Sequence, residues 1–92
     1  MAYTKIYFKS WCPWSRRALA LLNSKGVQFD AVDLTSDADQ LEAEMRERSG
    51  RTSVPQIFID DHHIGGYDDL AALEATGRLD KLLAGDDQLN AA

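Results

Sequence analysis

The stretch TKIYFKSWCPWSRRALALL, residues 4–22, passes from a strand pattern into a helix pattern with one cysteine at the junction. Residues 4–8 alternate and contain aromatic and β-branched side chains, which is typical of a strand. Pro13 suits the first turn of a helix, where its missing N–H removes no hydrogen bond. The leucines that follow recur at helical spacing, and Gly26 is placed to end the helix. The stretch therefore predicts a strand and a helix that meet at Cys12.

The rest of the chain continues this alternation of strands and helices. We expect a strand over residues 27–32, followed by a helix that begins with a capping pattern at residues 36–39 and ends near Gly50. Two strands over residues 56–59 and 62–64 should then be joined by a tight turn at Asp60 and Asp61. The chain should end with a helix that has Asp68 and Asp69 in its first turn and Gly77 at its end, and a short helix carrying Leu79, Leu82 and Leu83. The order predicts an α/β fold in which a mixed four-stranded sheet has helices on both faces.

Size and composition indicate one small globular domain. The chain has 92 residues, of which 45 % are hydrophobic, enough for one modest core. Its single cysteine cannot form an intrachain disulfide, which favours a reducing compartment. We see no signal-peptide pattern and no apolar run long enough to cross a bilayer, so we expect a cytoplasmic protein without a membrane partner. The domain is expected to span residues 1–84, with a flexible tail over residues 85–92.

Charge is unevenly distributed along the chain. The formal net charge is −5, which argues against nucleic acid as a partner. All 15 acidic residues lie from Asp30 onward, whereas residues 1–29 contain no acid. The basic residues in this first stretch are Lys5, Lys9, Arg16, Arg17 and Lys25. Because they bracket Cys12, they predict a local positive potential that suits a thiolate or a small anion.

Cys12 is the candidate nucleophile. At a helix start, unpaired backbone N–H groups and the helix dipole favour the thiolate, the form that attacks disulfides. The polar and bulky neighbours of Cys12 argue against its burial. The alternative is a buried and inert cysteine, which is a common state for a lone thiol.

Ser15 lies three residues after Cys12, where a C-x-x-C motif has its second cysteine. A serine hydroxyl can donate a hydrogen bond to a thiolate, but it cannot form a disulfide. A mixed disulfide on Cys12 must therefore be cleared by an external thiol. The alternative is that Ser15 only occupies the first helical turn.

Three further features of the sequence bear on function. Val54-Pro55 precedes an apolar strand, where the proline is either cis or an ordinary residue at a strand start. The glycine pair within residues 65–69 precedes a helix, where backbone amides can approach an anion such as a carboxylate; a simple loop is an equal alternative. His62 and His63 are adjacent on a strand and point to opposite faces, so we expect no metal site.

Three segments together carry a family resemblance: KSWCPWS (residues 9–15), SGRTSVPQIFI (residues 49–59) and HIGGYDD (residues 63–69). In this order and spacing they closely resemble glutaredoxins, and the likeness runs from Lys5 to Leu83. The resemblance implies a thioredoxin-like fold and glutathione as the second thiol.

The resemblance also implies roles for individual residues. Lys9 would hold the glycine carboxylate of glutathione, and Val54, before a cis Pro55, would pair its backbone with the glutathione cysteine. The amides of Tyr67 and Asp68 would bind the γ-glutamyl carboxylate, and the Asp68 side chain the amino group. The implied set is Cys12 as catalytic residue, Lys9, Trp14, Ser53, Val54, Pro55, Gly66, Tyr67 and Asp68 for glutathione, Pro13, Ser15 and Arg16 in support, and no metal ligand.

The chain departs from the family pattern at four positions. Ser15 replaces the second cysteine of the dithiol class, and Ser53 replaces a usual threonine while keeping its hydroxyl. Tyr67 stands where cysteine is frequent. Glu42 falls where arginine or glutamine often assists the glycine carboxylate, so we expect it to repel that group.

These observations lead to one main hypothesis and two alternatives. The main one is a glutathione-dependent thiol–disulfide oxidoreductase, a monomer that uses Cys12 in a monothiol mechanism on glutathionylated proteins and small disulfides. The first alternative is a glutathione-ligated [2Fe–2S] cluster carrier, for which one cysteine per monomer meets the ligand count. Pro13 and Trp14 are stiffer and bulkier than the glycine and phenylalanine typical of that branch. The second alternative is a redox-inactive binding module that reuses the fold.

Overall fold

The computed structural model describes residues 2–36 and 38–85. In chain order its elements are β1 (Thr4–Phe8), α1 (Pro13–Ser24), β2 (Asp30–Asp33), α2 (Asp39–Ser49), β3 (Gln56–Ile59), β4 (His62–Gly65), α3 (Tyr67–Ala75) and α4 (Arg78–Ala84). The strands form one sheet in the order β2-β1-β3-β4. β1 is parallel to β2 and antiparallel to β3, which is antiparallel to β4. The predicted mixed four-stranded sheet is confirmed.

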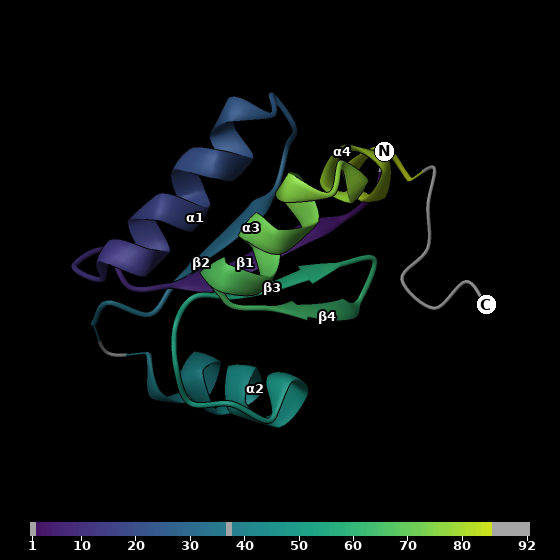
Figure 1. Cartoon of the computed structure of the whole chain (residues 1–92). Coiled ribbons are helices and arrows are strands. Elements are labelled where there is room, and N and C mark those ends of the chain that lie inside the picture. The colour runs from purple at the N-terminus through teal and green to yellow at the C-terminus, as the bar shows by residue number, and fades with distance from the viewer. Residues whose placement is uncertain (1, 37, 86–92) are drawn as a thin grey trace.

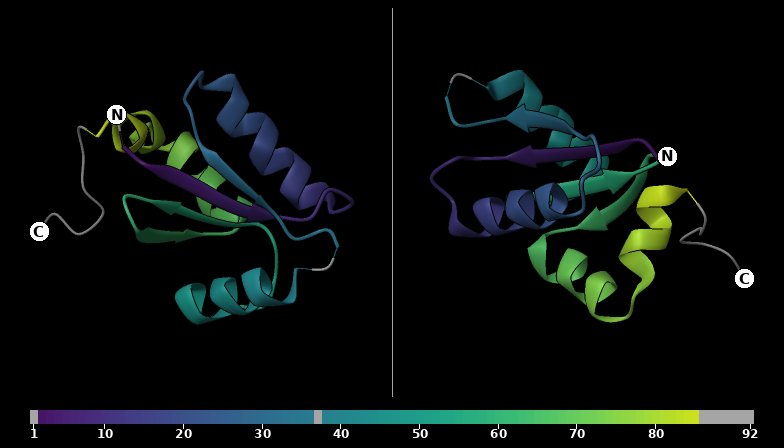
Figure 2. Two further views of the ribbon diagram at one scale, coloured as in Figure 1. Left: turned by 180° about the vertical axis from the view of Figure 1, so that it is seen from behind. Right: turned by 90° about the horizontal axis from the view of Figure 1, so that it is seen from above.

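Helices cover both faces of the sheet. Figures 1 and 2 show α2 on one side and α1, α3 and α4 on the other. Successive strand residues point to opposite faces, so the central strands β1 and β3 each contribute to two cores. The core under α1, α3 and α4 contains Ile6, Ala18, Leu22, Ile57, Ile59, Leu70, Leu79, Leu82 and Leu83. The core under α2 contains Tyr7, Leu34, Ala38, Met45 and Phe58.

β2 begins later than the expected residue 27. The alternation of Val27 and Phe29 is real, because both side chains pack against the core under α1, α3 and α4. The backbone, however, joins the parallel ladder only where Asp30 pairs with Lys5. Side-chain alternation therefore predicted the buried face correctly and the start of hydrogen bonding wrongly.

α2 lacks the side-chain cap expected at residues 36–39. Its N-cap is Ala38, which provides no side-chain hydrogen bond, and the helix starts at Asp39. Asp39 and Glu42 in the first turn complement the helix dipole instead. The expected end at Gly50 is confirmed, since Gly50 adopts a left-handed conformation with φ 70°.

Two changes of chain direction lie at the ends of β4, one between β3 and β4 and the other between β4 and α3. Asp60 and Asp61 both have positive φ, 50° and 65°, as a two-residue turn between antiparallel strands requires. β4 continues to Gly65, one residue past the expected end, and Gly65 has φ 120°, a conformation that only glycine adopts readily. The chain then enters α3 at once.

The C-terminal boundary follows from the last helix. α4 ends at Ala84 and Gly85 forms its C-cap, so Gly85 belongs to the folded part rather than to the expected tail. Residues 86–92 lie outside the described residues. The other end of the chain is tied to α4, since the Ala2 N–H donates to the Leu83 carbonyl at 3.0 Å. Among the described residues, no helix is long and apolar enough to cross a membrane.

Candidate active site

Cys12 is the N-cap residue of α1, with φ −82° and ψ 121°. Its N–H donates to the Lys9 carbonyl and its own carbonyl accepts from the Arg16 N–H, both at 3.0 Å. These two bonds hold the turn between β1 and α1. Pro13 occupies the first helical position, as predicted, and the sulfur lies at the N-terminal end of the helix.

Cys12 is buried, with 7 % of its surface exposed, so the expectation that its neighbours keep it exposed was wrong. The flanking Trp11 and Trp14 take the outward positions instead, with 63 % and 49 % exposed. The Cys12 Sγ turns inward and lies 3.8 Å from the Val54 carbonyl oxygen, to which the thiol can donate. Residues 42 positions apart in the chain therefore meet at the sulfur.

Ser15 is fully buried in the first turn of α1. Its Oγ accepts a hydrogen bond from the Lys9 N–H at 3.2 Å. This bond ties the helix back to the turn that precedes Cys12. Ser15 therefore stabilises the backbone around the sulfur from the first helical turn.

Fewer basic residues contribute to a positive potential around Cys12 than the sequence predicted. Arg16 and Arg17 are exposed, and the described residues offer neither of them a carboxylate partner. The three lysines of the first 29 residues are paired with acids from later in the chain: Lys5 with Glu44 at 3.6 Å, Lys9 with Glu42 at 3.4 Å, and Lys25 with Glu74 at 2.6 Å and Asp80 at 3.0 Å.

The Lys9–Glu42 pair bears directly on the expected glutathione contact. Both side chains are mostly covered, with 23 % and 21 % of their surfaces exposed. Glu42 also pairs with Arg46 at 3.4 Å, so one carboxylate lies between two cations. Glu42 thus neutralises Lys9 in the free protein, in addition to the expected repulsion of an incoming carboxylate.

A groove of about 260 Å³ adjoins the sulfur through Val54. It brings together seven of the predicted contact residues: Trp14, Ser53, Val54, Pro55, Gly66, Tyr67 and Asp68. The Val54–Pro55 peptide bond is cis, as the resemblance implied. Lys9 does not line this groove; its Nζ lies 5.8 Å from the centre of the Trp11 ring.

Aromatic rings form one wall of the groove. The Trp14 and Tyr67 ring centres are 6.1 Å apart, with the rings tilted by 33°. The Arg17 guanidinium lies 4.7 Å from the centre of the Trp14 ring, a distance suited to a cation–π contact. The indole beside Cys12 is therefore held between a cation and a second ring, which limits the positions it can adopt.

The N-terminus of α3 forms another side of the groove. The Gly66 N–H donates to the Asp69 Oδ2 at 3.0 Å, and Arg51 pairs with the same oxygen at 3.3 Å. Arg51 and Asp69 both line the groove, although they were not predicted as contact residues. An acid three residues after a glycine at a helix start is a capping pattern, and that signal could have identified Asp69.

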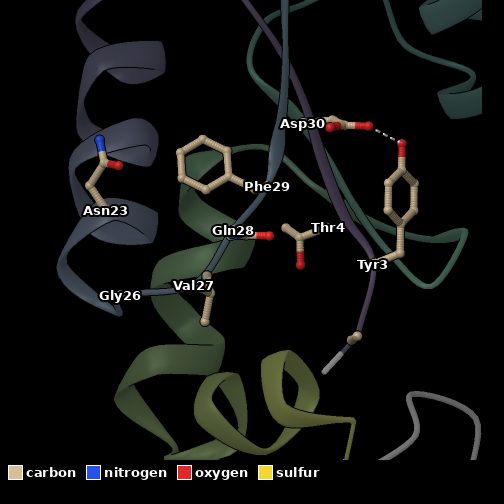
Figure 3. A pocket seen from close by; sticks show the side chains of 9 residues that line it. Tyr3, Thr4, Asn23, Gly26, Val27, Gln28, Phe29 and Asp30 are labelled. Carbon is tan, nitrogen blue, oxygen red and sulfur yellow. Dashed lines mark hydrogen bonds between the residues drawn. The ribbon is translucent and has the colours of Figure 1, made fainter.

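A larger hollow of about 720 Å³ lies at the opposite end of β1, where Thr4, Val27 and Phe29 contribute to its lining (Figure 3). No cysteine, histidine or basic side chain lines it. Tyr3 donates to the Asp30 Oδ2 at 2.6 Å at its edge. The smaller groove, which adjoins the only thiol, is therefore the better candidate for redox chemistry. Within residues 2–36 and 38–85, no three histidine, cysteine or acidic side chains are grouped to hold a metal ion.

Comparison with known proteins identifies the family to which this fold and this groove belong. The Glutaredoxin family model matches residues 3–64. The chain belongs to the glutaredoxin family. It is 58 % identical over 83 residues to glutaredoxin 3 of Escherichia coli strain K12, which covers 90 % of this chain and 99 % of that protein.

Solved glutaredoxin structures share the fold. The solution structure of glutaredoxin from Brucella melitensis has a TM-score of 0.81 and 47 % identity, covering 97 % of this chain and 96 % of that one. The crystal structure of the buckwheat glutaredoxin–glutathione complex has a TM-score of 0.82 and 25 % identity, covering 92 % and 79 %. The predicted family and thioredoxin-like fold are confirmed. Glutaredoxins are thiol oxidoreductases, and Cys12 is the one residue in this glutaredoxin with a thiol.

Proposed function

We propose that this glutaredoxin reduces mixed disulfides between proteins and glutathione, and small glutathione disulfides, by a monothiol mechanism. The observation that carries the proposal is the position of the Cys12 Sγ, at the N-terminus of α1 and 3.8 Å from the Val54 carbonyl oxygen. Val54 also lines the groove, so a disulfide held there would lie within reach of the sulfur.

The reaction has two exchange steps. The Cys12 thiolate attacks the glutathione sulfur of the mixed disulfide, a bond forms between the two sulfurs, and the protein leaves as a thiolate that takes up a proton. A second glutathione, as its thiolate, then attacks the glutathione sulfur on Cys12. Oxidised glutathione leaves and the Cys12 thiolate is restored. One substrate disulfide is reduced, and two glutathione moieties end as one disulfide.

The lack of a second thiol decides how the adduct is released. Cys12 is the only cysteine in the chain, and Ser15 cannot take over the role of a resolving sulfur. External glutathione must therefore clear each adduct. This requirement fits a compartment where glutathione is kept reduced, so we propose that the protein is cytoplasmic. We also propose that it acts as a monomer.

The walls of the groove suit the cysteine and the γ-glutamyl end of glutathione. The backbone of Val54, beside the cis peptide bond, is available for the peptide-like cysteine of the ligand. The first amides of α3, at Tyr67 and Asp68, can donate to the γ-glutamyl carboxylate, and the Asp68 carboxylate can accept from its amino group. A related glutaredoxin, the buckwheat protein, forms a complex with glutathione, which supports the same ligand here.

The decisive test is a deglutathionylation assay. A glutathionylated peptide is supplied with glutathione and a coupled system that reduces oxidised glutathione, and release of the free peptide thiol is measured. We expect steady turnover by the wild type and background rates for Cys12→Ser. Ser24→Ala, an exposed change at the other end of α1, keeps the thiol and serves as the control that should retain activity. Turnover by Cys12→Ser at the wild-type rate would rule the mechanism out.

A further inference from the structure

The side chain of Gln56, the first residue of β3, is fully buried. A buried amide must be hydrogen-bonded at both ends, because each unsatisfied group costs free energy. One end of this amide, Oε1, lies 2.7 Å from the His63 Nε2. The other end, Nε2, donates to the Ser53 carbonyl at 3.1 Å and approaches the Ser53 Oγ at 3.3 Å.

The Ser53 carbonyl determines the orientation of the Gln56 amide. A carbonyl oxygen can only accept, so it must face the NH₂ group rather than the amide oxygen. The Gln56 oxygen therefore faces His63. That oxygen is also an acceptor, so the His63 Nε2 must carry the proton and donate. The three residues form a directed chain in which His63 donates to Gln56 and Gln56 donates to Ser53.

His63 is held in place by the hairpin of β3 and β4. It pairs in register with Phe58, and the two ring centres are 5.1 Å apart. The short turn at Asp60 and Asp61 joins these strands, of which β4 is an edge strand of the sheet (Figure 1). The hairpin therefore fixes the backbone that carries the His63 ring.

The far end of this chain reaches the groove. Ser53 is exposed and lines the groove, and the next residue is Val54, whose carbonyl oxygen lies 3.8 Å from the Cys12 Sγ. The loop from Ser53 to Gln56 is thus closed by a side-chain bond across its base. Ser53 itself is exposed, so the bond from the Gln56 side chain to the Ser53 carbonyl ties the first residue of the loop to β3.

We propose that His63, acting through Gln56, is a positioning residue that holds Ser53 and Val54 in the conformation that binds the glutathione part of the substrate. The inference rests on the proposed function, in which that loop contacts glutathione. The role of His63 is indirect and acts through the loop, since neither His63 nor Gln56 lines the groove.

The kinetic test compares His63→Leu, which has no donor, with His63→Gln, whose amide nitrogen can take the place of Nε2. We expect His63→Leu to raise the KM for a glutathionylated peptide about threefold to tenfold, the range that corresponds to one lost hydrogen bond, with kcat within about twofold. His63→Gln should recover most of the KM. The rate of Cys12 alkylation by iodoacetamide should change much less than the KM in both variants.

His62→Leu is the matched control, since His62 is the exposed neighbour whose side chain points to the opposite face of the strand. It should leave the KM unchanged. An unchanged KM in His63→Leu overturns the inference, and so does a fall in kcat and alkylation rate that matches the rise in KM.

A second measurement does not depend on turnover. Hydrogen exchange of the Gln56 side-chain NH₂, followed by NMR on the free protein, should be faster in His63→Leu than in the wild type, with chemical-shift changes at Ser53 and Val54. Shift changes confined to the residues that contact His63 would overturn the positioning role. If the wild type fails to turn over the peptide, the proposed function fails, and this second measurement alone then decides whether His63 holds the loop.

Discussion

At the scale of single residues, the 3.8 Å contact between the Cys12 Sγ and the Val54 carbonyl oxygen has two different meanings. A protonated thiol can donate to that oxygen, whereas a thiolate can only be repelled by its lone pairs. Loss of the thiol proton therefore breaks the hydrogen bond and leaves both the Cys12 sulfur and the Val54 carbonyl without this partner. The helix amides at the N-terminus of α1 remain as the groups that attract the negative sulfur.

Glu42 provides a test of the charge balance around Lys9. Replacing Glu42 with Gln removes the carboxylate 3.4 Å from the Lys9 Nζ. The cation is then available for the glycine carboxylate of glutathione, the contact that the family resemblance implies. We expect the KM for glutathione to fall about twofold to fivefold, the range for a partly exposed ion pair, in assays at varied glutathione concentration. Glu47→Gln makes the same charge change elsewhere on α2 and should have a smaller effect. Equal effects of the two variants would indicate that only net charge matters.

His63 gives the site a pH-dependent contribution to stability. Burial lowers the pKa of His63 below its ordinary 6.5, and the charge of Arg51 lowers it further, while Asp69 opposes the shift. The unfolded chain then binds a proton more readily than the folded one, so stability falls as the pH drops below about 6.5. We expect the His63 ring to titrate below 6.5 by NMR, and His63→Gln to lose less stability between pH 7 and pH 5 than the wild type. A ring that titrates above 6.5 would contradict this.

At the scale of elements, the junction of β4 and α3 depends on one glycine. Gly65 has φ 120°, and a Cβ added there would lie 2.2 Å from the Asp69 Oδ2. That oxygen accepts the Gly66 N–H and pairs with Arg51. A side chain at Gly65 would therefore strain the backbone and displace the carboxylate that starts α3.

A series of three glycine-to-alanine variants separates these costs. Gly66→Ala should be near neutral, because φ is negative and the new Cβ meets only the Pro55 oxygen at 3.5 Å. Gly26→Ala should lose about 1 kcal/mol, because φ is 68° but the space is open. Gly65→Ala should lose about 2 to 4 kcal/mol, since it has both the strained backbone and the collision. Urea unfolding measures all three, and an equal loss in Gly26→Ala and Gly65→Ala would show that the collision is relieved.

The sequence pattern predicted some elements well because local and tertiary requirements agree there. β1 and β3 were predicted with their observed bounds, since β1 alternates with aromatic and β-branched residues and β3 is a short apolar run between Pro55 and Asp60. The start of β2 was missed because alternation reports a buried face and not backbone pairing. The groove unites segments about 40 residues apart, and no local pattern predicts such a meeting. Its expected residues came from the family resemblance, and the burial of Cys12 could not be predicted because its sulfur turns toward Val54, a residue far away in the chain.

At the scale of the whole molecule, the surroundings of Cys12 limit what can approach it. The residue is 7 % exposed, while Trp11 and Trp14 project beside it. A small disulfide can enter the groove, but a second copy of the chain must first pass the two indoles. Anything that reacts with the sulfur is therefore expected to be slender at the point of contact.

The [2Fe–2S] alternative can be tested on this ground. After anaerobic reconstitution with iron, sulfide and glutathione, we expect a colourless protein that elutes as a monomer. The physical reason is that a bridged cluster needs two copies to bring Cys12 together across the indoles. The absorption spectrum and size-exclusion profile provide the measurement, with Cys12→Ser as the control for nonspecific iron. A coloured dimer formed by the wild type and not by the control would reverse the expectation.

The uneven charge along the chain has a consequence for how its parts meet. Residues 1–29 carry five positive charges and no negative one, and every lysine among them pairs with an acid from beyond that stretch. The two portions attract each other over a Debye length, before any apolar contact forms. If the polypeptide were cut after Phe29, the two fragments should associate readily at low ionic strength and dissociate as salt is added.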